Sequence, residues 1–139
     1  MTLRDMHKKH HWQIAGLTFF QLHLLYDKHY KEQVALVDSI ARRIQLLGGV
    51  SIAMAADVAE TTMILRPPRG REGAFAQLSR LVAARAIVIL ATRSDAAKTN
   101  SLGDFGINDM LVGDVLRTNE MQVWFLSEHL VDAPIARFD

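Results

Sequence analysis

The chain has 139 residues, of which half are hydrophobic and 22% are charged, and its formal charge at pH 7 is +1. A chain of this length is expected to form one domain over residues 1–139, and its near-neutral charge argues against a dedicated nucleic-acid binder. The absence of cysteine excludes disulfides and thiolate metal sites; the lack of a signal peptide and of an apolar run of roughly 20 residues predicts a soluble, cytoplasmic protein.

Apolar residues recur at three- and four-residue intervals through most of the chain, and this helical period predicts four helices. The first extends from about residue 3 to residue 14. It stops near Gly16, because glycine tolerates the left-handed conformation found at helix ends. The second begins around Thr18 and ends at the pair Gly48 and Gly49. At 1.5 Å per residue, the second helix would be roughly 45 Å long.

A long crossover is predicted in the middle of the chain. Residues 50–62 are rich in alanine and are expected to hold a short helix, whereas "LRPPRGRE" (65–72) must be a loop because paired prolines cannot donate backbone hydrogen bonds. The third helix is expected over about 72–97, with Phe75 and Leu90 among its core residues, and the fourth over about 105–130. Four long helices with one long middle connection predict an all-α, ferritin-like four-helix bundle.

One polar stripe follows the predicted second helix. Its four residues, which fall within roughly 100° of the helix circumference, are His23, Asp27, Asp38 and Arg42. His23 and Asp27 are one turn apart and could share a metal ion. Asp38 lies about 22 Å farther along the axis, so it cannot reach that ion from the same helix.

A second copy of this helix would bring the two ends of the stripe together. If two copies pack antiparallel about a two-fold axis near residues 32 and 33, the His23 end of one faces the Asp38 end of the other. Each dimer would then hold two equivalent sites between subunits. His11, beyond the bend at Gly16, can turn toward His23. The predicted ligands therefore converge only in an oligomer.

The same stretch resembles the ferroxidase signature of the Dps family, the small ferritin-like starvation-protection proteins. In this chain it is "HHWQIAGLTFFQLHLLYDKHYKEQVALVDSIARRIQLLGG" (10–49), and the resemblance continues through "RPPRGRE" and "LGDFGINDMLVGDVLRTNEMQVWFLSEHLVD". It covers nearly the whole chain. The resemblance implies a hollow shell of twelve subunits in which iron (Fe²⁺) is oxidised between subunits, preferably by hydrogen peroxide or else by oxygen, and stored as ferric mineral.

Carried over to this chain, the resemblance assigns the catalytic iron ligands to His11, His23 and Asp27 of one subunit and Asp38 of its two-fold neighbour. The family pattern has a glutamate four residues after Asp38, where this chain has Arg42. A guanidinium is permanently positive and cannot coordinate metal. Either Arg42 pairs with Asp38 and weakens or silences the site, or it points aside and iron binds at reduced affinity.

The remaining histidines and aromatic residues have weaker assignments. The histidines without ligand spacing, expected in solvated or capping positions, are His7, His10, His29 and His129; His29 is also a candidate outer ligand. In the family, a tryptophan placed as Trp12 is here lies near the iron and absorbs stray oxidising equivalents, whereas interface packing is the simpler role. Trp124 and Phe125 are expected in the core or in an interface.

Acidic residues gather at the start of the predicted fourth helix. Asp104 is expected to cap this helix and to interact favourably with the positive, amino-terminal end of the helix dipole. In the family the segment "GDFGIND" lines three-fold pores, so the resemblance makes Asp104 and Asp109 candidate iron-entry residues, since rings of carboxylates attract cations. Asp114 is a weaker candidate, turned about 140° from Asp109.

Two classes of function remain open, with a third less suited to the pore-like segment. The first is an iron-storing, detoxifying cage with a ferroxidase activity that Arg42 weakens. The second is a ferroxidase-deficient structural or DNA-associated shell, and the third is a dimeric bundle without a cage. Some family members bind DNA through a lysine-rich tail. Here only Arg4, Lys8 and Lys9 are basic near the start, and "DAPIARFD" at the end holds two acids, so no basic tail supports DNA binding.

Overall fold

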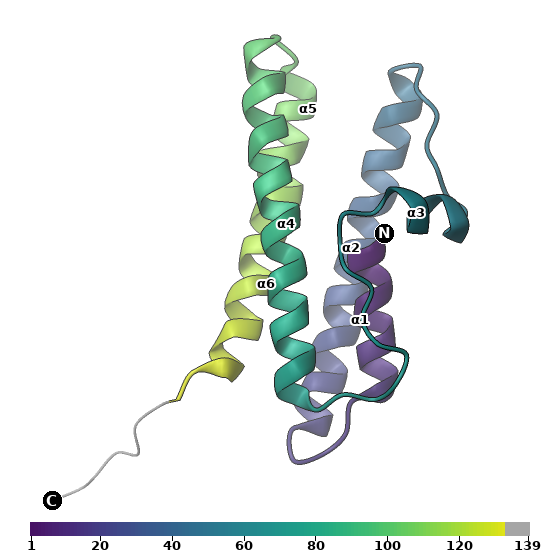
Figure 1. Ribbon diagram of the computed structural model, residues 1–139. Helices are drawn as coiled ribbons and strands as arrows, with labels where there is room; N and C mark the ends of the chain where they lie inside the picture. The colour runs from purple at the N-terminus through teal and green to yellow at the C-terminus, as the bar shows by residue number, and fades with distance from the viewer. Residues whose placement is uncertain (133–139) are drawn as a thin grey trace, which may run out of the picture.

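The computed structural model describes residues 1–132, and every regular element within them is helical (Figure 1). The elements in chain order are α1 Thr2–Gln13, α2 Phe19–Leu46, α3 Ala55–Thr61, α4 Ala74–Ser101, α5 Phe105–Met110, the π-helix η1 Leu111–Leu116, α6 Arg117–Ser127 and the 3₁₀-helix η2 Glu128–Leu130. Because α5, η1 and α6 follow one another without a break, they form one long final helix. The all-helical, ferritin-like prediction is confirmed, including the short helix in the crossover.

The helices form two hairpins, α1 with α2 and α4 with the final helix (Figure 1). The turn after α1 contains Gly16 at φ 101°, and the turn after α4 contains Gly103 at φ 74°. This left-handed region is strained for residues with a Cβ, which explains glycine at both turns. The side chain of Asp104 then accepts a hydrogen bond of 3.0 Å from the backbone N–H of Ile107, so the predicted helix cap is confirmed.

The two hairpins share one apolar core, which is concentrated beside α1. Its buried members come from α1, α2, α4 and α6 and include Leu3, Met6, Leu22, Tyr26, Leu78, Leu81 and Leu126. α1 has only 12 residues, whereas α2 and α4 have 28 each. The carboxyl end of α2 therefore extends beyond the helix that packs antiparallel to it.

Several residues predicted for the core lie on the surface of the subunit instead. Phe75 and Leu90 of α4 are 72% and 66% exposed, so their assignment to the core is wrong. Trp124 is 60% exposed and Phe125 40%, which leaves an interface as the only predicted role that fits Trp124. The helical period marks an apolar stripe, but it does not say whether the same chain or another covers it.

α4 is, by length and composition alone, apolar enough to cross a membrane; within residues 1–132 no other helix is. The core helix of a bundle meets the same criterion. α4 contacts α1 on one side and α5, η1 and α6 on the other, so its place here is that of a bundle helix.

Candidate metal centre

His11 and His23 form a stacked pair beside the turn that joins α1 to α2. Their ring centroids are 3.8 Å apart with an interplanar angle of 18°. Nδ1 of His11 donates a hydrogen bond of 2.7 Å to the backbone carbonyl of His23, and Nδ1 of His23 donates one of 2.9 Å to the carbonyl of His11. A carbonyl oxygen only accepts, so both rings carry their proton on Nδ1. Nε2 of each ring therefore keeps its lone pair, as a metal ligand requires.

Asp27 lies one turn beyond His23 and is surrounded by cations. Its Oδ1 is 2.9 Å from Nζ of Lys8, and its Oδ2 is 2.8 Å from Nζ of Lys31. The bonds from Lys31 and Lys8 lower the pKa of Asp27 to about 2. The carboxylate is ionised at neutral pH, as a ligand must be, but two ammonium groups compete with any metal ion for its oxygens.

Asp38 and Arg42 form a surface ion pair on α2, with Nε of Arg42 2.9 Å from Oδ2 of Asp38. The side chains are 60% and 78% exposed. Of the two arrangements that the sequence allows, the structure has the one in which Arg42 occupies the carboxylate. An exposed pair of this kind is weak, so a metal ion or a partner subunit can displace it.

The structure brings together only part of the predicted ligand set. His11, His23 and Asp27 occupy one end of the hairpin, whereas Asp38 lies fifteen residues, or about 22 Å of helix, beyond His23. Within residues 1–132, no three His, Asp or Glu side chains are close enough to hold a metal ion. A complete site from these residues needs a second subunit.

Trp12 projects into solvent beside the histidine pair. It is 73% exposed, and it is followed by other exposed apolar residues at the same end of the hairpin: Leu17, Phe20 and Leu24. A surface of this kind normally lies against another protein. Its position beside His11 is compatible with both predicted roles, packing in an interface and absorbing oxidising equivalents, and both remain predictions.

The predicted pore residues lie in different environments. Asp104 is half-buried, caps α5 and is 3.5 Å from Nη2 of Arg43, so much of its charge is already compensated. Asp109 is exposed on α5, and Asp114 is exposed on η1. Of the three carboxylates, Asp109 and Asp114 present the more accessible charge.

Three histidines expected in solvated or capping positions are instead buried inside the bundle. His7 and His10 are 0% exposed and His29 is 1% exposed, so that expectation is wrong for all three. His7 and His10 follow Leu3 and Met6 at helical spacing and share their inward face, a signal that was present in the sequence. His129 is exposed, as expected, and its Nδ1 donates to the carbonyl of Phe125 at 2.8 Å.

A fully buried arginine, which sequence reasoning missed, organises this polar interior. Arg85 donates to Oε1 of Gln122 at 2.6 Å and 3.1 Å, to the carbonyl of Leu81 at 3.2 Å, and to Nε2 of His7. Burial lowers the pKa of Arg85 to about 9. Arg85 is still protonated at neutral pH, and a cation in the middle of a subunit repels metal ions, so the bundle interior is unsuited to an iron site.

Burial keeps these histidines neutral. It lowers the pKa of His10 to about 4, with a smaller contribution from Lys9, and the pKa of His29 to about 3, with a smaller contribution from Arg85. Burial, and then Arg85, also lowers the pKa of His7 well below 6.5. Neither ring nitrogen of His10 has a hydrogen-bond partner within residues 1–132. These histidines belong to the interior and not to the metal centre.

Comparisons with known proteins agree with the fold and with the resemblance. The ferritin-like domain family matches residues 1–135. An "Uncharacterized protein in bpoA2 5'region" of Kitasatospora aureofaciens is 43% identical over 102 residues, 73% of this chain and 68% of that protein. A "Nutrient stress-induced DNA-binding protein" of Nostoc sp. is 31% identical over 114 residues, 82% of this chain but only 62% of that protein.

Among solved structures, DpsC from Streptomyces coelicolor matches with a TM-score of 0.94 and 50% identity, over 97% of this chain and 78% of that one. A Dps homologue from Halobacterium salinarum matches with a TM-score of 0.92 and 26% identity, over 98% and 75% of the two chains. The chain therefore belongs to the ferritin-like family, as a homologue of its Dps proteins.

Proposed function

We propose that this protein is an iron storage and detoxification protein of the cytoplasm, which oxidises Fe²⁺ at sites between subunits and keeps the ferric product inside a dodecameric shell. Iron is the substrate and cargo. The unit that assembles is the single ferritin-like domain over residues 1–139, of which 133–139 lie outside the described residues.

The observation that carries this proposal is the histidine pair. His11 and His23 hold each other in the tautomer that leaves both Nε2 atoms available, and the ionised carboxylate of Asp27 is one turn away. Two imidazoles and a carboxylate with open positions suit Fe²⁺. The hydrogen bonds that fix the two rings are internal to the hairpin, so the tautomer of both histidines is set before a metal ion binds.

The proposed reaction consumes peroxide without forming hydroxyl radicals. Two Fe²⁺ ions each give one electron to hydrogen peroxide, whose O–O bond breaks, and its oxygens leave as water or enter the mineral. Hydrolysis of the two Fe³⁺ ions to ferric oxyhydroxide releases four protons in the balanced reaction with two further waters. The chain supplies the ligands that hold the ions next to each other, and a one-electron step that would release a radical is thereby avoided.

The entry of Fe²⁺ and the assembly of the shell are proposed from residues that are exposed in a single subunit. Asp109, with Asp104, would lie at a pore and attract Fe²⁺. The exposed apolar groups Trp12, Phe75, Leu90 and Trp124 would be covered by neighbouring subunits. Trp12, beside His11, would then take up oxidising equivalents that escape the site.

A second candidate, a shell that assembles without effective oxidation, is favoured by the ion pair between Asp38 and Arg42. DNA association through a basic tail finds no support in the described residues. Arg4 pairs with Asp5, Lys8 with Asp27, and Lys9 bonds to Gln13, so all three predicted basic side chains are engaged. Residues 133–139 of the acidic "DAPIARFD" segment lie outside the described residues.

Two substitutions at Arg42 distinguish these functions. Arg42→Gln releases Asp38 but adds no ligand, whereas Arg42→Glu releases Asp38 and adds a carboxylate. With hydrogen peroxide as oxidant, we expect the initial rate of Fe²⁺ oxidation to rise a few-fold in the first variant and about tenfold in the second. The rate is measured by stopped-flow ferric absorbance on the assembled protein.

Arg117→Glu is the matched control, because it makes the same charge change at an exposed position on a different helix. Equal rates in the unmodified protein and both Arg42 variants would show that Arg42 does not limit the site. If the unmodified protein oxidises Fe²⁺ no faster than buffer does and Arg42→Glu restores oxidation, the second candidate is correct.

A further inference from the structure

A groove lies between α1 and the crossover that joins α2 to α4. It is a cavity of about 560 Å³, and its walls come from one face of α1, from α3 and from the segment 62–69 that contains the paired prolines. Small-molecule sites have volumes of about 300–1,000 Å³, so the groove has room for such a ligand. The proposed iron chemistry uses none of the residues that line it.

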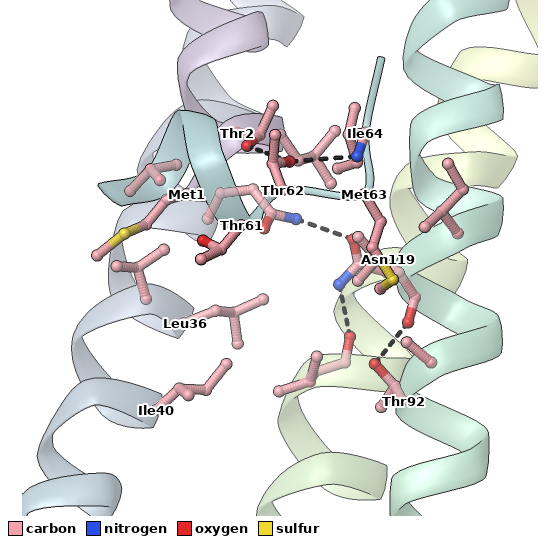
Figure 2. Close-up of a pocket in the computed structure, with 18 of the residues that line it drawn as sticks. Met1, Thr2, Leu36, Ile40, Thr61, Thr62, Met63, Ile64, Thr92 and Asn119 are labelled. Atoms are coloured by element: carbon pink, nitrogen blue, oxygen red, sulfur yellow. Dashed lines mark hydrogen bonds between the residues drawn. The ribbon is translucent and has the colours of Figure 1, made fainter. Parts of the chain in front are cut away.

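Hydrogen bonds attach the crossover to α1 at both ends of this groove. At one end the hydroxyl of Thr2 donates to Oγ1 of Thr62 at 2.7 Å (Figure 2). At the other end Nζ of Lys9 donates to the backbone carbonyl of Gly70 at 3.3 Å. The paired prolines lie between these two attachments and stiffen the segment, because each proline ring fixes its φ angle. The groove is therefore formed before a ligand binds, which reduces the entropy that binding costs.

The floor of the groove is apolar. Met6 of α1 is only 4% exposed, and Pro67 of the crossover is buried. Val58 and Ile64 are half-buried at the end near α3, where Ala59 also lines the wall. None of the residues of α3 is buried, so this helix leaves its apolar side chains partly open to solvent. Such a surface favours the aliphatic part of a ligand, since its burial removes apolar area from water.

Three cations border the same groove, Lys9, Arg66 and Arg69. Within residues 1–132, none of them forms an ion pair with a carboxylate. Asp5 is the only acid in the lining, and Nε of Arg4 neutralises it at 2.7 Å. Lys9 and Arg69 lie at the end where the crossover meets the second half of α1. The groove therefore has one apolar end and one positive end.

We propose that this groove binds a small amphipathic carboxylate, with the carboxylate at Lys9 and Arg69 and an aliphatic chain over Met6 toward Val58. Guanidinium groups suit a carboxylate, because their N–H donors match its two oxygens. The lining residues of α1 from Thr2 to Lys9 span about 10 Å, and an extended chain of roughly eight to ten carbon atoms has this length.

The closed ends of the groove favour a small molecule over a continuous peptide. The attachments of Thr62 to Thr2 and of Gly70 to Lys9 block both ends, so an extended polypeptide could not pass through. The proposal does not rest on the proposed function, because no lining residue belongs to the candidate metal centre or to the predicted pore.

Titration calorimetry of the assembled protein with decanoate, below the concentration at which decanoate forms micelles, tests the proposal. We expect one decanoate to bind per subunit. Butyrate has the same carboxylate but a short chain, and decyltrimethylammonium has the same chain but a positive charge. Both should bind at least about tenfold more weakly than decanoate, because each lacks one of the two groups that the groove accommodates.

Two matched pairs of variants locate the ligand. The double variant Arg66→Gln/Arg69→Gln removes two cations from the groove, whereas Arg71→Gln removes an exposed arginine of the same crossover that does not line it. We expect the Kd of decanoate to rise about tenfold in the first and less than about twofold in the second. Ala59→Asp places a carboxylate on the apolar wall and should also raise the Kd about tenfold, whereas Ala56→Asp, at an exposed position outside the groove, should not.

Equal affinities for decanoate and decyltrimethylammonium would show adsorption to apolar surface alone and would overturn the proposal, as would equal changes within either pair of variants. The anionic headgroups of a membrane offer similar chemistry, so vesicles of phosphatidylglycerol form a separate arm. Cosedimentation with the vesicles that Ala59→Asp abolishes, without binding of free decanoate, would assign the groove to a lipid surface and would also overturn the proposal. We expect no cosedimentation.

Discussion

His10 and His11 are neighbours in the sequence, but they belong to two groups of histidines that lie in opposite environments. His10 is fully buried, neutral and without a hydrogen-bond partner in the described chain, whereas His11, the next residue, stacks on His23 at the surface with Nε2 available. Successive helical residues point about 100° apart, so one step along α1 separates the interior from the candidate metal centre. The position of a histidine on its helix, more than its count in the sequence, determines what it can do.

The largest expected effect is the loss of stability on substitution of the buried Arg85. Arg85→Ala removes the donor that satisfies Gln122 and His7 and leaves a cavity, so we expect the free energy of unfolding to fall by about 3 kcal/mol. Guanidinium unfolding at fixed protein concentration measures it. Arg93→Ala, on the same helix but in an exposed ion pair with Glu120, should cost less than about 1 kcal/mol. Similar losses in the two variants would contradict the role given to Arg85.

The next effect tests the other group of histidines. His23→Ala removes one ligand and the ring that stacks on His11, so we expect peroxide-driven Fe²⁺ oxidation to slow by about 100-fold. The thermal midpoint should change by only a few degrees, because His23 is partly exposed. His129→Ala, a histidine outside both groups, should leave the oxidation rate unchanged. A His23→Ala protein with the rate of the unmodified one would remove this pair from the metal centre.

The effect that is smallest near neutral pH is a pH dependence of stability. In the folded protein His10 takes up a proton only near pH 4, but in the unfolded chain it does so near pH 6.5. The unfolded state therefore binds the extra proton between these values, and stability falls as the pH falls through that window, by up to about 1.4 kcal/mol per pH unit for this residue. His10→Leu should reduce that slope, measured from unfolding midpoints at pH 7, 6, 5 and 4.

The control for this pH series is His129→Leu, at an exposed position whose substitution should leave the slope unchanged. His7 and His29 have lowered pKa values as well, so part of the slope remains in His10→Leu. The same slope in all three proteins would show that the protonation of His10 does not affect folding.

Much of the fold could be predicted from local patterns. Apolar periodicity, glycines at helix ends and the paired prolines were sufficient to predict four helices and their crossover, because those signals act within a few residues of the chain. The exposure of Phe75 and Leu90 could not be predicted. An apolar stripe on a helix has the same sequence pattern whether the same chain or another subunit covers it.

For the candidate site, the pattern identified which residues to consider but not their contacts. The i+4 pairing of Asp38 with Arg42 followed from helix geometry and is present. The contact of Lys8 with Asp27 joins two helices, so no spacing along the chain reveals it. Arg85 was missed because a charged residue is expected at the surface, and only the polar groups around it explain its burial.

The π-helical segment Leu111–Leu116 has a consequence for how this chain is compared with its relatives. A π-turn holds one residue more than an α-turn, so the residues after it are rotated by one position relative to those before it. Asn119, Gln122 and Leu126 face inward on that shifted register. An alignment with a relative whose final helix is α-helical throughout would need a one-residue gap inside a helix, and equivalences drawn across Gly113 without that gap would pair interior positions with surface ones.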